Sequence, residues 1–524
     1  MVVSVSAASE QVLVRAPWVA SRTYEDERGS FSALSNAKTH EFMTFENEAS
    51  VLWSLIDEGT TENDLISKSK ALGVSESLND FIELLKDAEL LETELSKSSR
   101  MNIKPSQRPG IMKRGASVPQ ENSSFNEIET AIQDRAIATG ALWIFFWEIT
   151  YRCNEQCVHC FNPGAAHKPG DKSGRKKAAE LKRDQIIPLL DDLVKIGVFR
   201  LVLSGGEIFV HKDIFFILEE AQKRGFQVHL YTNGLLLTEE KLQRVASFWP
   251  DTVSISLYSD DPVKHDAITR VKGSFNKSTK ALNLLKEWGI RATVKAPLMN
   301  STAYDWKALD AIAEETGSRI AFDSMISAGN DMNQDPTQLN MDMIQVIELA
   351  ATPGSPIFVG DKTNNFGKKS KSLKREVCGA GVTLMSMTPE GTVTPCCALP
   401  LDVGSVREQS FKEIWESRNS SVQKPIVRPE KLPPEEKVSR TPTTLAEWRS
   451  IKLENYEECG THDRCSWCDK CPGAALNETG NVFSASSVQC KIATGKMEAA
   501  KMLERGMTLN EIIREVNLIS DSAV

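Results

Sequence analysis

Apolar and polar residues alternate along the middle of the chain in a pattern that predicts six strand–helix units. Short runs rich in Val, Ile, Leu and Phe are each followed by an amphipathic segment, such as Asp184–Lys195 or Asp213–Arg224, and this order is typical of a parallel sheet. The predicted strands are Leu142–Ile149, Phe199–Leu203, Gln227–Tyr231, Thr252–Leu257, Arg291–Pro297 and Arg319–Phe322. We expect the sheet to be either doubly wound or curved into a partial barrel, and in both forms the site lies at the carboxyl ends of the strands.

The first part of the chain, residues 10–95, predicts a separate small domain. Apolar runs at 12–17 and 41–45 are expected to form the short strands of a hairpin. Apolar residues then recur at helical spacing, which predicts three helices; they cover 49–56, 61–71 and 78–85. A hairpin followed by three helices is a winged-helix-like pattern, although an ordinary small α+β domain would show the same periodicity.

Changes in composition divide the rest of the chain. Residues 96–127 are rich in Ser, Pro, Lys and Arg and poor in apolar side chains, which is typical of a linker. The strand–helix units occupy 138–330. Beyond them the alternation stops and Cys, Gly and Pro become frequent, so we expect a cysteine-rich domain at 370–492 and a helical tail at 493–524.

Composition and charge exclude several classes of protein. The chain has 524 residues, of which 41% are apolar, and a net charge of −9. Its densest apolar stretch, Ala141–Trp147, ends at Glu148 and is far shorter than the ~20 residues that span a bilayer. The N-terminus lacks the basic and apolar regions of an export signal. We therefore expect a cytoplasmic protein that acts on neither nucleic acid nor membrane.

The eleven cysteines are strongly clustered. Cys153, Cys157 and Cys160 directly follow the first predicted strand, and the other eight lie between Cys378 and Cys490. In a reducing compartment such clusters indicate metal binding. Three thiolates on one loop leave one iron of a four-iron cluster open for another ligand. The alternative is a zinc site completed by a nearby histidine, His159 or His167.

The stretch TYRCNEQCVHCF resembles the CxxxCxΦC loop of the radical S-adenosylmethionine (SAM) enzymes. The resemblance implies that Cys153, Cys157 and Cys160 bind a [4Fe–4S] cluster whose open iron chelates the amino and carboxylate groups of SAM. Reduction of this cluster would cleave SAM to a 5′-deoxyadenosyl radical. His159 stands at the Φ position, which in that superfamily approaches the adenine.

Other motifs occur in the order that this resemblance requires. Ser204-Gly205-Gly206-Glu207 follows the second strand and resembles the family's GGE motif, which implies that Glu207 accepts from the SAM ammonium group. Thr232 and Asn233 after the third strand, and Ser256 in the fourth, resemble its ribose-side contacts. The segments His265–Thr269 and Gly273–Phe275 resemble the peptide-modifying branch.

The C-terminal cysteines resemble those of the SPASM extension, which holds auxiliary clusters in that branch. The spacing Cys378-x12-Gly391-x4-Cys396 fits its first half, whereas the later spacing departs from the usual one. The resemblance implies two auxiliary [4Fe–4S] clusters; the first ligand set is Cys459, Cys465, Cys468 and Cys490, and the second is Cys378, Cys396 and Cys471. Cys397 is either a bystander or a fourth ligand. Two zinc-ribbon sites are the alternative.

The segment ENEASVLWSLIDEG and the helix end LLKDAELL resemble the peptide-recognition domains related to the pyrroloquinoline-quinone chaperone. Such domains bind a leader peptide by adding it as a strand to a small sheet; a purely structural domain is the alternative. The expected fold is α/β: a partial (β/α)6 TIM-type barrel with an N-terminal winged-helix-like domain and a C-terminal SPASM extension.

The leading hypothesis is a radical SAM/SPASM maturase that crosslinks a ribosomally made precursor peptide through a C–C, C–O or thioether bond. A flavodoxin- or ferredoxin-type protein would reduce it. Alternatives are sulfatase-maturase-like oxidation of Cys or Ser on a protein, peptide excision or epimerisation, and a non-catalytic zinc-ribbon adaptor. No catalytic residue is assigned, but Asp323 and Tyr258, each just after a predicted strand, are candidate bases.

Overall fold

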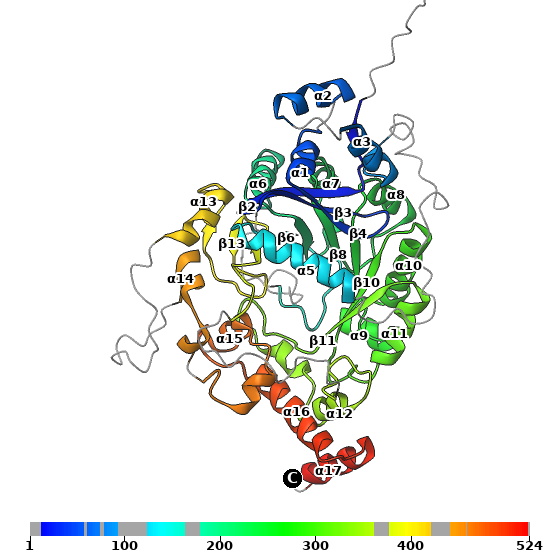
Figure 1. The fold of residues 1–524 in the computed structure, drawn as a ribbon. Coiled ribbons are helices and arrows are strands. Elements are labelled where there is room, and N and C mark those ends of the chain that lie inside the picture. Colours follow the sequence, from blue (N-terminus) through cyan, green and yellow to red (C-terminus); the bar gives the residue numbers. More distant parts are fainter. Residues whose placement is uncertain are drawn as a thin grey trace, which may run out of the picture.

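The computed structural model describes residues 12–56, 60–73, 78–92, 123–162, 179–360, 377–420, 441–456 and 458–521 (Figure 1). At its centre lies a nine-stranded sheet in the order β11-β10-β9-β8-β7-β6-β12-β13-β14. The six predicted strands are confirmed as neighbouring parallel strands. They are β6 (Ile144–Thr150), β7 (Arg200–Gly205), β8 (Gln227–Thr232), β9 (Thr252–Ser256), β10 (Ala292–Pro297) and β11 (Arg319–Asp323).

Alternate residues of these strands face opposite sides of the sheet. Phe145, Trp147 and Ile149 of β6 enter the core beneath the covering helices, whereas the ring of Phe146 lies edge-on to Tyr231 of β8 at 5.5 Å. That contact joins strands two apart, so the sheet is curved and the polar inner face is concave. The covering helices are α6 (Arg183–Lys195), α7 (Ile214–Lys223), α8 (Glu239–Ser247), α9 (Pro262–Thr269), α10 (Ser274–Glu287) and α11 (Trp306–Glu315).

The C-terminal region extends the same sheet. Strand β12 (Leu384–Met387) pairs in parallel with β6, and β13 (Thr392–Thr394) and β14 (Gly404–Ser405) follow antiparallel. Helices α13 (Phe411–Glu416), α14 (Leu445–Ser450) and α15 (Pro472–Thr479) come next. Helix α16 (Ser487–Glu504) packs with α12 (Met343–Ala351) and α17 (Leu509–Asp521) around a second core. The 492/493 boundary that composition suggested therefore falls inside α16. Short 3₁₀ helices are η3 (Ile208–Val210), η4 (Asp335–Leu339), η5 (Ser417–Asn419), η8 (Leu453–Asn455) and η9 (Asp463–Trp467).

The N-terminal domain has an antiparallel sheet of β2 (Val19–Asp26), β3 (Gly29–Asn36) and β4 (Glu41–Glu46). The three predicted helices are confirmed as α1 (Asn47–Ser54), α2 (Glu62–Ala71) and α3 (Leu78–Asp87). The predicted strand at 12–17 is only β1 (Val14–Arg15), which pairs with β5 (Leu91–Glu92). The β2–β3 hairpin was missed because polar residues at successive positions of both strands are buried, which removes the alternation that marks a half-exposed strand.

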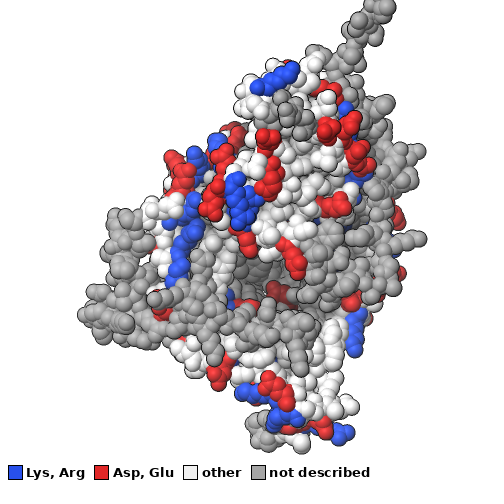
Figure 2. Space-filling view, viewed as in Figure 1, with Lys and Arg blue, Asp and Glu red and all other residues white. Residues whose placement is uncertain are grey.

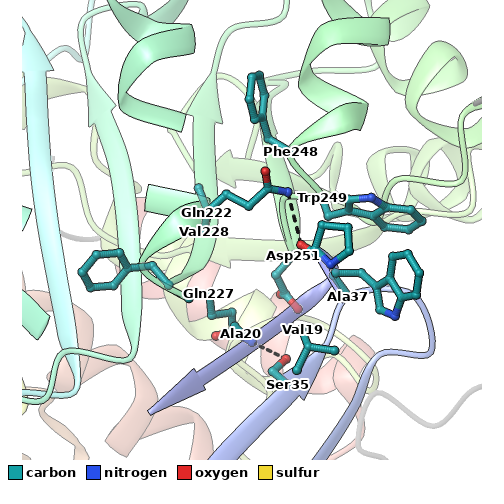
Figure 3. Close-up of a pocket in the computed structure, with 14 residues that line it drawn as sticks. Val19, Ala20, Ser35, Ala37, Gln222, Gln227, Val228, Phe248, Trp249 and Asp251 are labelled. Atoms are coloured by element: carbon teal, nitrogen blue, oxygen red, sulfur yellow. Dashed lines mark hydrogen bonds between the residues drawn. The ribbon is translucent and has the colours of Figure 1, made fainter. Parts of the chain in front are cut away.

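This domain packs on the amino ends of the barrel strands. Tyr24 and Phe31 share a core with Trp143 and Phe199, the residues that directly precede β6 and β7, and the Arg22 Nε donates to the Val198 carbonyl at 2.9 Å. Figure 3 shows the same seam at β8, where Gln227 Nε2 donates to Ser35 Oγ at 2.9 Å. Helix α5 (Ser123–Ala138) packs on the sheet and begins within the predicted 96–127 linker; residues 96–122 of that linker lie outside the described residues. Across the described part of the chain, no helix has both the length and the apolar character that crossing a bilayer requires.

Candidate active site at the carboxyl ends of the strands

The loop with Cys153, Cys157 and Cys160 directly follows β6, at the end of the barrel opposite the N-terminal domain. Its backbone is fixed to the end of α9, because Gln156 N donates to the Thr269 carbonyl at 3.1 Å and Val158 N to the Ile268 carbonyl at 3.0 Å. Burial raises the pKa of Cys153 to about 12 and that of Cys160 to about 11. Iron binding would remove these protons.

The GGE motif lies against this loop. Gly206 N donates to the Thr150 carbonyl at 2.7 Å, and Glu207 N to the Arg152 carbonyl at 2.9 Å. A Cβ on Gly206 would lie 2.4 Å from the Arg152 carbonyl oxygen, so only glycine allows this approach. Gly205 has φ +126° and its carbonyl accepts from Asn162 Nδ2 at 3.1 Å.

Glu207 is fully buried, and its carboxylate organises the neighbouring strand ends. It accepts from the Thr232 hydroxyl at 2.8 Å, from Asn233 N at 2.9 Å and from Phe209 N at 2.9 Å. Asn233 Nδ2 in turn donates to Asn154 Oδ1 of the cysteine loop at 2.7 Å. The three predicted motifs thus form one hydrogen-bonded unit. Contact of Glu207 with the SAM ammonium group stays a prediction.

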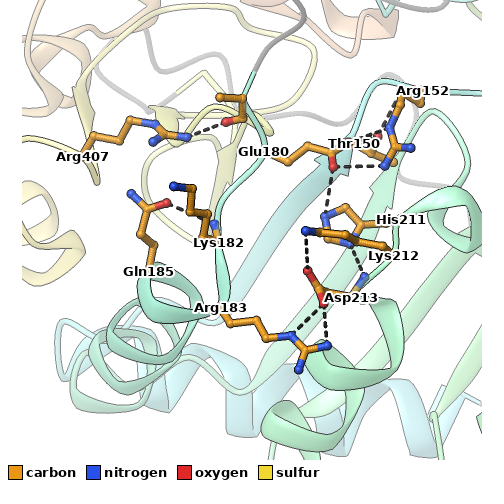
Figure 4. Close-up of polar contacts among 11 residues, drawn as sticks. Thr150, Arg152, Glu180, Lys182, Arg183, Gln185, His211, Lys212, Asp213 and Arg407 are labelled. Carbon is orange, nitrogen blue, oxygen red and sulfur yellow. Dashed lines mark hydrogen bonds and ion pairs between the residues drawn. The ribbon is translucent and has the colours of Figure 1, made fainter.

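A second network of hydrogen bonds and ion pairs connects the start of the cysteine loop to neighbouring segments of the barrel (Figure 4). The Glu180 carboxylate accepts from Arg152 Nε at 3.0 Å and from Arg152 Nη2 at 3.1 Å. It also accepts from the Thr150 hydroxyl and lies 3.5 Å from His211 Nε2. Glu180 therefore holds the residues that immediately precede Cys153. This role was not apparent from the sequence, because nothing local marks Glu180.

Three aromatic rings line the other side of the cysteine loop. His159 lies edge-on to Tyr258 with ring centroids 4.5 Å apart, and Tyr258 stacks on His265 at 5.3 Å. The Tyr258 hydroxyl lies 3.9 Å from Cys157 Sγ and interacts with the Ser256 side chain. Burial lowers the pKa of His159 to about 4, so its ring is neutral. His159 Nδ1 is buried with no hydrogen-bond partner among the described residues and could therefore bond to a ligand such as SAM.

The structure adds a buried carboxyl group that the sequence prediction omitted. Glu148 is 3% exposed, and its Oε2 accepts from the Tyr151 hydroxyl at 3.1 Å. Burial, together with the nearby Cys396 and Glu390, raises its pKa to about 8. Glu148 also interacts electrostatically with Cys160, so it lies between the first cysteine loop and the C-terminal cysteines. A single acidic residue in the apolar run of β6 was the available signal.

The first predicted auxiliary ligand set converges in the structure. Cys459, Cys465, Cys468 and Cys490 line one cavity of about 470 Å³, although they come from a loop, η9 and α16. Four thiols of the kind that hold a [4Fe–4S] cluster therefore border one cavity, although within the described residues no group of three or more His, Cys, Asp or Glu is gathered closely enough to hold a metal ion.

The other predicted set lies nearby. Cys471 interacts electrostatically with Cys396, and Tyr456 interacts with Cys378, Cys459 and Cys471. The Tyr456 hydroxyl is buried with no partner among the described residues, and the sulfur of a bound cluster could accept its hydrogen. The ligand assignments themselves stay predictions.

A polar loop after β11 joins the two cysteine regions. Asn330 N donates to the Phe161 carbonyl at 2.9 Å, and Asn330 Nδ2 to the Cys397 carbonyl at 2.9 Å. The Cys397 side chain hydrogen-bonds to Cys396, which helps to lower the pKa of Cys396 to about 7. The role of Cys397, as a bystander or a fourth ligand, stays a prediction.

The two candidate bases occupy different surroundings. Asp323 ends β11 and lines a cavity of about 220 Å³ together with Cys468, Cys471 and Lys496. Burial raises its pKa, against the effect of Lys295 and Lys496. Tyr258 is buried between His159 and His265, and burial raises its pKa. A catalytic role stays a prediction for both.

The sequence matches two family descriptions. Residues 147–313 match the radical SAM superfamily, and residues 378–437 match SPASM, an iron–sulfur cluster-binding domain. The first range contains Cys153, Cys157 and Cys160, and the second contains Cys378, Cys396 and Cys397. Cys459 and the cysteines that follow it lie outside both ranges.

The chain is also similar to characterised proteins. It is 26% identical over 320 residues to an AdoMet-dependent heme synthase of Methanosarcina barkeri, a match that covers 56% of this chain and 87% of that protein. It is 24% identical over 277 residues to a PqqA peptide cyclase of Granulibacter bethesdensis, which covers 51% and 72%. The crystal structure of Streptococcus suis SuiB bound to precursor peptide SuiA superposes with a TM-score of 0.50 at 13% identity, over 91% of this chain and 99% of SuiB, and supports the same fold. The chain is therefore a radical SAM enzyme with a SPASM domain, and its cofactors are SAM and [4Fe–4S] clusters.

Proposed function

We propose that this enzyme crosslinks two residues of a ribosomally made precursor peptide, and that the N-terminal domain binds the leader. The observation that carries the proposal is the free edge of a small sheet: among the described strands, β4 pairs only with β3. The names of two similar proteins, a PqqA peptide cyclase and SuiB bound to precursor peptide SuiA, point to the same class of substrate.

The edge of β4 suits an added peptide strand. The opposite edge strand, β2, faces the barrel, where Ser21 N donates to the Gly225 carbonyl at 3.0 Å. One face of β4 packs on the domain core, where the Phe45 ring lies edge-on to Phe81 of α3 at 5.5 Å. Glu41 and Thr44 of the same strand are exposed. An unpaired edge offers main-chain donors and acceptors to an extended peptide.

The chemistry requires removal of two hydrogens from the peptide. Bound SAM and the iron–sulfur clusters supply hydrogen-atom abstraction and take up an electron. The hydrogen-bonded unit of Glu207, Thr232 and Asn233 orients the SAM-side motifs. The second hydrogen leaves as a proton, and Glu148 or Asp323 is the proposed acceptor. A pKa near 8 for Glu148 is close to the operating pH that general-base catalysis favours.

The test is anaerobic incubation of a full-length precursor peptide with SAM and dithionite, followed by mass spectrometry. A crosslink gives a product lighter by two hydrogen atoms, without fragment ions between the joined residues. Sulfatase-type oxidation would instead place a carbonyl on one Cys or Ser, which hydrazide labelling detects. A tetrapyrrole is tested as a substrate in parallel, because one similar protein is named AdoMet-dependent heme synthase. An unmodified peptide together with a consumed tetrapyrrole would overturn the proposal.

Leader binding is tested by proline substitutions in β4. Successive N–H groups of an edge strand point alternately toward and away from the sheet, so of Met43→Pro and Thr44→Pro only one removes an outward donor. We expect that variant to bind the leader at least tenfold more weakly and to keep its stability. Deletion of the domain is a poorer test, because it would expose Trp143 and Phe199 of the barrel.

A further inference from the structure

A lysine ammonium group lies against one ligand of the first auxiliary cysteine set. Beside the first set, Lys470 makes three contacts. Its Nζ lies 2.8 Å from Cys459 Sγ and 2.9 Å from the Ser484 carbonyl oxygen, and 3.9 Å from the centroid of the Tyr456 ring. These contacts fix a positive charge against a predicted cluster ligand.

The second set has charges of both signs nearby. Asp323 and Lys496 line one cavity together with Cys471, and Cys468 of the first set borders the same cavity. The charges of Asp323 and Lys496 offset each other, whereas Lys470 directly contacts a ligand of the first set.

Charge and hydrogen bonding around the ligating sulfurs govern the reduction potential of an iron–sulfur cluster. A nearby ammonium group stabilises the added electron, and a hydrogen bond to a ligating sulfur acts in the same direction. A nearby carboxylate opposes reduction. Burial strengthens both effects, because the local dielectric constant is low.

We propose that Lys470 raises the reduction potential of the cluster bound by Cys459, Cys465, Cys468 and Cys490 above that of the cluster bound by Cys378, Cys396 and Cys471. This difference favours the reduced form of the cluster next to Lys470. The Tyr456 ring and the Ser484 carbonyl hold the Lys470 ammonium group against Cys459. The proposal rests on the cluster assignment, but not on the identity of the substrate.

The test is a redox titration of the reconstituted, substrate-free enzyme, with each cluster followed by electron paramagnetic resonance. Lys470→Met should lower the potential of one auxiliary signal and leave the other and the SAM-binding cluster unchanged. Lys470→Gln can still donate to Cys459 and should lower it less, while Lys470→Arg should retain most of the potential. The matched control is Lys501→Met: Lys501 lines the same cavity, but it is 53% exposed and pairs with Glu498, so solvent screens its charge.

Unchanged potentials in Lys470→Met with full iron content would overturn the proposal. If Lys470→Met loses iron, the comparison of Lys470→Arg with Lys470→Gln carries the test. The potential of the cluster next to Lys470 should be higher in Lys470→Arg than in Lys470→Gln. Equal potentials in these two variants, with full iron content, would count against the proposal. Because no peptide is present, failure here is distinct from failure to observe a crosslink.

Discussion

The Thr232 hydroxyl lies 2.8 Å from both carboxylate oxygens of the fully buried Glu207. This contact joins the end of the third barrel strand to the GGE turn, whose backbone also hydrogen-bonds to the residues before Cys153. A single buried carboxylate therefore sets the relative positions of the segments predicted to hold SAM and its cluster.

Thr232→Val should weaken both stability and SAM binding. It removes a donor from a buried carboxylate, which costs roughly 1–3 kcal/mol. Urea denaturation and equilibrium dialysis with SAM measure the two effects. Thr279→Val is the control, because the Thr279 hydroxyl bonds to carbonyl oxygens of its own helix. Equal SAM affinity in the Thr232 variant and the wild type would show that the contact does not position the site.

Gly206→Ala should disrupt the SAM-binding cluster. Its Cβ would lie 2.4 Å from the Arg152 carbonyl oxygen, so the cysteine loop must shift. We expect iron to fall from about 12 to about 8 per chain, since each cubane holds four. The Cβ of Gly480→Ala meets no atom of the described residues within 4 Å, although φ at this position is +73°. This variant should keep its iron at a cost of about 1 kcal/mol in stability. Full iron in Gly206→Ala would mean that the loop adapts.

Replacement of Cys459, Cys465, Cys468 and Cys490 by Ala should remove about four of about 12 irons and leave dithionite-driven SAM cleavage intact. The matched variant, with Ala at Cys153, Cys157 and Cys160, should lose the same amount of iron and all SAM cleavage. Iron and labile sulfide assays, with 5′-deoxyadenosine as the product measured, separate the two. Loss of about eight irons in the first variant would show that the auxiliary ligand sets are shared.

Glu148 should make stability fall as the pH rises. The group has an ordinary pKa of 4.5 and a folded-state pKa of about 8, so the folded protein holds the extra proton between these values. The free energy of unfolding therefore decreases from about pH 5 to about pH 8. Tyr151, Glu390 and Cys396 interact with this group, and Glu148→Gln leaves them in place.

In Glu148→Gln this part of the slope should disappear, so the variant should be more stable than the wild type at pH 8.5. Urea denaturation across this pH range provides the measurement. An identical slope in both proteins would show that Glu148 is ionised when folded.

Local sequence patterns were sufficient to predict the barrel strands. They did not predict the strand that extends the sheet or the buried carboxyl groups near the site. The six strands follow from runs of apolar residues, and the cysteine loop and GGE motif follow from their places at strand ends. The pairing of β12 with β6 joins residues more than 200 positions apart, and local periodicity carries no information about such a partner. Glu148 and Glu180 were missed for a related reason: a buried carboxyl group is recognised by its neighbours, and these come from distant segments.

The placement of the N-terminal sheet has a consequence for the length of the substrate. It packs beside Trp143 and Phe199, at the amino ends of β6 and β7, whereas Cys153 follows the carboxyl end of β6. The seven residues of β6 span about 23 Å at about 3.3 Å per residue. A precursor anchored on β4 must therefore cross at least this height before its modified residues reach the cluster loop. The height of the barrel would therefore help to select which residues are modified. Their distance along the peptide from the leader segment bound at β4 would count as well as their chemistry.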